Sequence, residues 1–156
     1  MAAMTDDLIS ELEQQEHDLV LERFDHADAW ALGSLLVKMA TERSLPVAID
    51  IRHGEQQVFH AGLAGSVADN DRWIERKVRV VERYGASSFL VGRRLAAKGQ
   101  ELDAGMGVNP ADYAAHGGAF PIRIRDVGVV GVVTVSGLPQ AEDHALVVEA
   151  LRAFRS

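Results

Sequence analysis

The segment from Val129 to Val135 constrains the fold of this chain more than any other feature of its sequence. It predicts a β-strand that is apolar on both faces, apart from the hydroxyl of Thr134. A strand of this kind lies in the interior of a sheet, because both of its faces need cover from other elements. The alternating stretch from Phe120 to Arg125 is its expected hairpin partner, joined through a turn at Asp126 to Gly128. The sequence therefore predicts three layers, with the sheet between two layers of helices.

The spacing of apolar residues predicts the remaining elements. Helices are expected over about residues 5–15, 26–43, 70–84, 88–98 and 110–115, with a closing helix whose first turn holds residues 142 and 143. A second hairpin is expected over residues 47–52 and 56–61. No internal repeat or linker divides the chain. We therefore expect a single α/β (α+β) domain over residues 1–156, with a central antiparallel sheet.

Charge and composition exclude several classes of function. The 23 acidic and 16 basic residues give a net charge of −7, which argues against general nucleic-acid binding because like charges repel. Cysteine is absent from the sequence, which excludes disulfides, thiolate metal ligands and a cysteine nucleophile. The first 18 residues are acidic and carry neither a signal peptide nor an apolar run long enough to span a membrane. We expect a cytoplasmic protein that binds neither nucleic acid nor membrane.

Three motifs in the second half of the chain resemble a known superfamily. They are His116-Gly117-Gly118-Ala119-Phe120-Pro121-Ile122, Val130-Gly131-Val132-Val133-Thr134-Val135-Ser136-Gly137, and Glu142-Asp143 at the start of the last helix. Together they are similar to the signatures of the GlcG/HbpS haem-degrading-domain superfamily. Three further segments, Ala29 to Gly33, Val47 to Ile51 and Trp73 to Lys77, resemble a subgroup of uncharacterised cytosolic proteins related to a yeast member.

This resemblance implies a profilin-like fold, in which helices cover both faces of an antiparallel sheet. Members of the superfamily bind haem or corrinoids, form symmetric oligomers or have no known role. The resemblance therefore makes haem or a related tetrapyrrole the first cofactor to test, while the cofactor itself stays open. The haem ligand is not part of the matching motifs, so no iron-binding residue carries over to this chain. A fold shared in this way constrains function less than it constrains structure.

Two glycine-containing turns form the first candidate ligand site. Gly117 and Gly118 let backbone N–H groups converge, and Ser136 and Gly137 precede the positive end of the last helix. These four residues can jointly hold a carboxylate or another anion. In the alternative interpretation, the glycines only end a helix and permit close strand packing, while Ser136 and Glu142 satisfy backbone donors. The sequence leaves both interpretations open.

His116 is the best single candidate for a ligand or proton-transfer group, because it adjoins the glycine pair. The alternative is that it ends the short helix over residues 110–115 and complements the helix dipole. No spacing typical of a zinc or iron site is present, so no dedicated metal site is predicted. Ser136, Asp143 and His144 lack the context of a hydrolase triad, which excludes a serine hydrolase.

Two further features carry charge. Asp50 is either a buried functional carboxylate or the partner of Arg52 in an ordinary salt bridge. Four arginines recur along one predicted helix face, where they can meet an acidic partner, another protomer or the propionates of a tetrapyrrole, or can simply face solvent. These interface candidates are Arg72, Arg76, Arg79 and Arg83.

The leading functional hypothesis is a homo-oligomeric, non-hydrolytic protein that binds a small molecule, with haem or a related tetrapyrrole as the ligand. The first alternative is an oligomeric interaction or scaffold protein that presents surfaces to protein partners. The second alternative is a small-metabolite enzyme that uses the glycine pair to hold a small carboxylate. Haem degradation requires oxygen activation and a source of electrons, and no pattern in the sequence indicates either.

Overall fold

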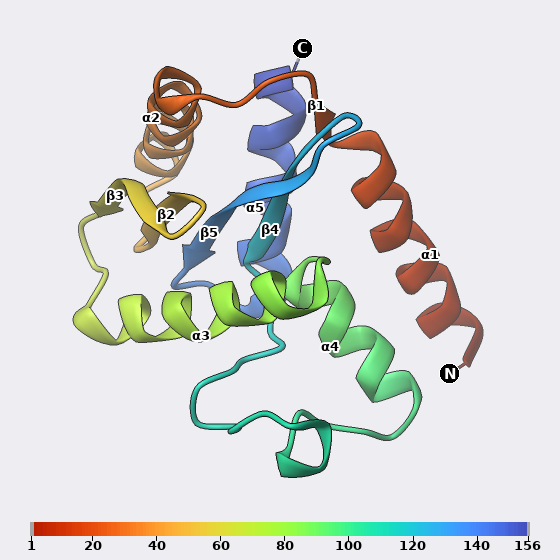
Figure 1. Cartoon of the computed structure of the whole chain (residues 1–156). Coiled ribbons are helices and arrows are strands. Elements are labelled where there is room, and N and C mark those ends of the chain that lie inside the picture. Colours follow the sequence, from red (N-terminus) through yellow and green to blue (C-terminus); the bar gives the residue numbers. More distant parts are fainter. Residues whose placement is uncertain (1, 156) are drawn as a thin grey trace.

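A computed structural model describes residues 2–155 of the chain, with side chains described from Asp7 onward. These residues form six helical segments and five strands, and Figure 1 shows their arrangement. In chain order they are α1 (Ala2–Asp18), β1 (Val20–Leu21), α2 (His26–Glu42), β2 (Ala48–His53), β3 (Gln56–Gly62), α3 (Ala68–Tyr84), α4 (Ser88–Ala97), η1 (Ala104–Met106), β4 (Ala119–Ile124), β5 (Gly128–Ser136) and α5 (Gln140–Arg155). The helices and strands predicted from the spacing of apolar residues are present, with the exception of residues 110–115.

The sheet has the strand order β1-β4-β5-β2-β3, so β5 lies at its centre. Its residues from Gly131 to Ser136 are buried, as the two apolar faces of this segment predict. The pairs β4–β5, β5–β2 and β2–β3 are antiparallel. The two-residue strand β1 pairs in parallel with β4 and was not predicted, because two residues are too few to show alternation.

Helices cover both faces of the sheet, which confirms the predicted three-layer arrangement. The largest apolar cluster joins α2 and α5 to one face through side chains such as Leu36, Val133 and Leu151. Helix α3 covers the opposite face, where Ile74 and Val78 pack against the strands. Helices α4 and α1 pack together beyond α3 and close one end of the molecule, on the right in Figure 1. Within residues 2–155, no helix combines the length and apolar character needed to cross a membrane.

Residues 110–115 do not form the predicted helix, and this changes the interpretation of His116. Asn109 starts a turn, with its side-chain oxygen accepting from the backbone of Ala111, but the turn does not continue. The backbone N–H of Ala114 donates instead to the carbonyl of Arg76 on α3. Side chains from α3 also bind carbonyl groups that a helix would have used. His116 therefore lies in a segment without regular secondary structure, and the interpretation that it ends a helix is wrong.

Candidate functional site

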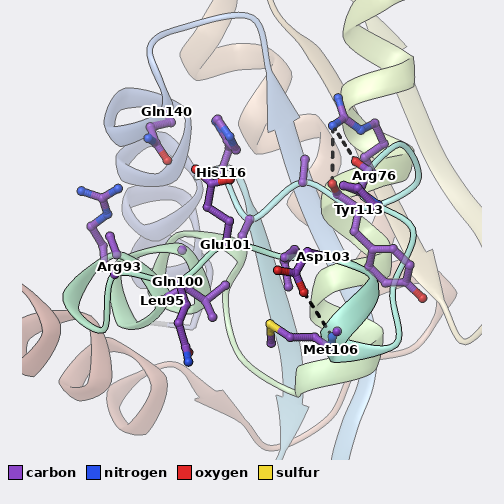
Figure 2. Close-up of a pocket in the computed structure, with 18 residues that line it drawn as sticks. Arg76, Arg93, Leu95, Gln100, Glu101, Asp103, Met106, Tyr113, His116 and Gln140 are labelled. Carbon is purple, nitrogen blue, oxygen red and sulfur yellow. Dashed lines mark hydrogen bonds between the residues drawn. The ribbon is translucent and has the colours of Figure 1, made fainter.

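A cavity lies between α4, the long connection that precedes β4, and the first residue of α5. Its volume is about 1120 Å³. Figure 2 shows the side chains around it. The wall contains Arg76, Gly92, Arg93, Leu95, Ala96, Gly99, Gln100, Glu101, Leu102, Asp103, Gly105, Met106, Pro110, Tyr113, Ala114, Ala115, His116 and Gln140. Polar groups and an apolar surface therefore share one concave site, which is the usual character of a small-molecule pocket.

Arginines of α3 hold the outer wall of this cavity in place. Arg76 donates to the carbonyls of Pro110 and Tyr113, at 3.3 and 3.4 Å. Arg79 donates to the carbonyl of Asp112 at 3.0 Å and Arg83 to that of Met106 at 3.4 Å. These are three of the four arginines predicted as an interface stripe. The fourth, Arg72, is exposed and lies 3.9 Å from Glu75. The stripe therefore has an intramolecular role that the sequence did not indicate.

Two arginines of the wall have a buried nitrogen without a partner. The Nε atoms of Arg76 and Arg93 are both shielded from solvent, and no acceptor for either lies among the described residues. The guanidinium of Arg76 lies 4.6 Å from the ring centre of Trp73, and that of Arg93 lies 5.8 Å from that of Phe89. Such contacts stabilise a cation but leave its N–H donors unused. Arg93 was not among the predicted site residues.

His116 lies at the same cavity, where one part of the residue is accessible to solvent and its imidazole packs against Trp73 at a distance of 5.3 Å between ring centres. Partial burial lowers the pKa of His116, and the nearby charges of Lys77, Arg76 and Arg93 lower it further. The imidazole is therefore unprotonated at neutral pH and keeps a free electron pair, which a metal ligand or a general base requires. His116 is the predicted ligand-binding residue that the structure places at the cavity.

The other predicted ligand-binding residues lie elsewhere, in close packing between β4, β5 and α5. Gly117, Gly118 and Ser136 are buried, and the cavity wall includes none of the predicted glycines. The backbone N–H of Gly117 donates to the side chain of Gln140 at 3.0 Å. At Gly118, which has φ of 138°, a side chain would clash with the backbone of Val135. Gly117 and Gly118 therefore permit close packing at this point, and their binding of a ligand stays a prediction.

A carboxylate from the chain itself occupies the predicted anion position. Asp143 accepts from the backbone N–H of Leu138 at 2.9 Å and of Gly137 at 3.3 Å. Lys77 on α3 donates to the same carboxylate at 3.2 Å and to the carbonyl of Val135 at 3.3 Å. Burial lowers the pKa of Lys77 and raises that of Asp143, while the attraction between the two opposes both shifts. Sequence analysis did not identify this pair, although Lys77 follows Ile74 at the spacing of the buried face.

Other candidates also have partners inside the protein. The carboxylate of Asp50 is 1% exposed and accepts from Arg52 at 3.0 Å and from Gln57 at 2.6 Å. Asp50 thus forms the salt bridge with Arg52 that was one of the two interpretations of this residue. His144 is buried, and its Nε2–H donates to the side chain of Gln15 at 2.7 Å. Burial lowers the pKa of His144 to about 4, so it is neutral at physiological pH.

Residues 24–152 match the model of a family described as haem degrading protein HbpS-like. A UPF0303 protein of Streptomyces coelicolor is 60% identical over 152 residues, which cover 97% of this chain and 96% of that protein. The crystal structure of Ybr137w protein is similar, with a TM-score of 0.85 and 37% identity over 94% of this chain and 87% of that one. A structure described as a PduOC:heme complex shares the fold, with a TM-score of 0.70 and 15% identity over 83% of this chain and 94% of that one. The chain therefore belongs to the family described as haem degrading protein HbpS-like and, by its identity to the Streptomyces protein, to the UPF0303 group.

Proposed function

We propose that this protein binds haem or a related tetrapyrrole in the cavity beside α4. The observation that carries the proposal is the combination, in one wall, of the neutral imidazole of His116 with the guanidinium groups of Arg76 and Arg93. Haem needs an electron-pair donor for its iron and cations for its carboxylates. Family membership and the haem complex of the structural neighbour support the choice of ligand.

The size and lining of the cavity fit a ligand of this kind. A volume of about 1120 Å³ is just above the usual range for small-molecule sites, which is about 300 to 1,000 Å³. Leu95, Leu102 and Met106 contribute apolar surface for the macrocycle, and Tyr113 contributes an aromatic ring. His116 would hold the iron, and Arg76 and Arg93 would bind the propionates. When bound, the iron would supply redox chemistry, while the residues of this chain orient it and exclude water from one side.

A haem titration followed by visible absorbance tests this proposal. We expect a saturable shift of the main haem absorption band with the wild-type protein and loss of that shift in His116→Ala. His17→Ala is the matched control, because His17 is also exposed but lies on α1 and outside the cavity. Circular dichroism of each variant checks that the fold is retained. A titration without saturation would refute tetrapyrrole binding, and a stable oligomer in the same samples would then favour the scaffold function.

A further inference from the structure

Arg93 differs from ten other arginines of the chain in its contacts. Seven of those arginines lie within 4.0 Å of a carboxylate and three more donate to backbone carbonyls. Arg93 projects from α4 into the cavity wall, where its guanidinium lies near the ring of Phe89 and its buried Nε has no acceptor among the described residues. Its neighbour Arg94 makes a salt bridge of 3.1 Å with Glu13 on α1.

A buried N–H donor without an acceptor costs free energy, and the cost is larger when the donor is charged. The guanidinium offers Nε–H and one Nη–H side by side, which match the two oxygens of a carboxylate. A ligand carboxylate that displaces the atoms now covering this edge of Arg93 would satisfy the buried donor and neutralise the charge. A neutral or cationic ligand group would leave the donor unsatisfied.

The surroundings of Arg93 favour an anion. Figure 2 shows Arg93 and Gln140 on one side of the cavity, Arg76 and Tyr113 on the other, and His116 between them. Gln140 is the first residue of α5, so the positive end of that helix lies at the same wall. The acidic groups of the wall are Glu101, which is exposed, and Asp103, whose side chain accepts from the backbone of Met106.

We propose that Arg93 binds a carboxylate of the ligand and so selects tetrapyrroles with free propionates over neutral ones. This inference rests on the proposed function for the identity of the ligand, but its recognition chemistry is that of a carboxylate. A small carboxylate metabolite would offer the same group, and the experiment below separates the two sources.

The first arm compares haem with its dimethyl ester, in which both propionates are neutral, in one detergent-containing buffer. We expect the wild-type protein to bind haem about tenfold or more tightly than the ester, because a bidentate pair between a guanidinium and a carboxylate is stronger than hydrogen bonds to a neutral ester. Arg93→Gln should lose most of this preference, and the matched control Arg94→Gln should keep it. Equal affinity of the wild-type protein for both compounds, or an unchanged preference in Arg93→Gln, would overturn the inference while leaving haem binding intact.

The second arm measures the melting temperature of the same three proteins with citrate and with glutarate. One outcome is that the wild-type protein fails to bind haem but is stabilised by a carboxylate, and that Arg93→Gln alone loses this stabilisation. In that case the proposed tetrapyrrole ligand is wrong, while the role of Arg93 in binding a carboxylate stands. If neither haem nor a carboxylate binds, both proposals are wrong. Melting temperatures without ligand show whether Arg93→Gln is folded. Arg93→Lys keeps the charge but not the paired donors, so we expect its preference for haem over the dimethyl ester to lie between those of the wild-type protein and Arg93→Gln.

Discussion

Lys77 on α3 and Asp143 on α5 form an ion pair across one end of the sheet, with Nζ and Oδ2 3.2 Å apart and side chains that are 4% and 2% exposed. Removing one partner leaves a buried charge without compensation, which costs about 3 to 5 kcal/mol in typical proteins. We therefore expect Lys77→Met to lower the free energy of unfolding by an amount in this range. Urea unfolding of the wild-type protein and the variant measures the change.

The double variant Lys77→Met/Asp143→Asn distinguishes an ion pair from two independent packing contacts. The amide introduced at position 143 needs no counter-charge, and its oxygen can still accept from the backbone of Leu138. We expect the double variant to be less destabilised than the sum of the two single variants. Lys38→Met on the exposed face of α2 is the control and should change stability by about 0.5 kcal/mol or less. Additive single effects would show that the pair contributes no coupling.

Gly118→Ala should destabilise the fold rather than change ligand affinity directly. A Cβ at this position would clash with the carbonyl oxygen of Val135 and lie 2.7 Å from Nζ of Lys77, and φ is 138°. We expect a loss of about 3 kcal/mol or more, from strain and from disturbance of the ion pair. Gly99→Ala is the control, since φ is 66° there and no atom lies within 4 Å of the added Cβ. The control substitution should lower the free energy of unfolding by about 1 to 2 kcal/mol. Equal losses of stability in the two variants, measured by thermal unfolding, would contradict this account.

His144 should make the protein less stable as the pH falls below neutrality. Its pKa is about 4 in the folded protein, against about 6.5 in an unfolded chain. The unfolded chain therefore binds more protons between these pH values, and stability is lost progressively as the pH falls from about 6.5 to 4, by about 3 kcal/mol in total. The raised pKa of Asp143 acts in the opposite direction.

The difference between wild type and His144→Gln isolates this contribution, because both proteins retain Asp143 and His116. We expect the stability difference between them to shrink as the pH falls from 6.5 to 4 and to be constant above pH 7. Urea unfolding at several pH values measures it. A difference that does not change with pH would mean that the folded protein accepts a proton on His144 as readily as the unfolded chain does.

The sequence predicts those parts of the fold that depend on local spacing. The two apolar faces of the segment from Val129 to Val135 place β5 at the centre of the sheet, and Asp25 forms a capping box with Asp28 at the start of α2. Residues 110–115 show the limit of this reasoning. The start signal at Asn109 does form a turn, but arginines from α3 take the carbonyls that would have continued it. A local pattern cannot reveal a competitor about 30 residues away.

In the candidate site too, local sequence patterns reveal some residues, while tertiary packing alone reveals others. His116 was identified because its motif is local, whereas Arg93 acquires its significance only when α4 packs against the connection before β4. The pair Lys77 and Asp143 also depends on tertiary packing, which brings a helix face to the start of another helix. A carboxylate does lie beside Gly137, where the sequence predicts an anion, but it belongs to the side chain of Asp143 and not to a ligand.

Arg79→Ala/Arg83→Ala should loosen the connection between α4 and β4 without dissociating any oligomer. Both guanidinium groups donate to carbonyls of this segment, at Asp112 and Met106, and the segment forms the outer wall of the cavity. Losing these charge-assisted hydrogen bonds should increase local opening, so that backbone amides over residues 104–113 exchange hydrogen about five- to tenfold faster. Hydrogen exchange followed by mass spectrometry measures this rate, and light scattering of the same samples measures the oligomeric state.

Arg72→Ala is the matched control, because Arg72 lies on the same helix but is exposed and contacts Glu75 rather than the connection. It should leave the exchange rates unchanged. If the double variant instead exchanges at the wild-type rate while an oligomer dissociates, these arginines act between protomers, as the sequence hypothesis of an interface stripe held. Faster exchange with an intact assembly would show that Arg79 and Arg83 hold the cavity wall in place. Such support matters for ligand binding, because the position of the wall relative to α3 sets the distance between Arg76 and Arg93 on opposite sides of the cavity.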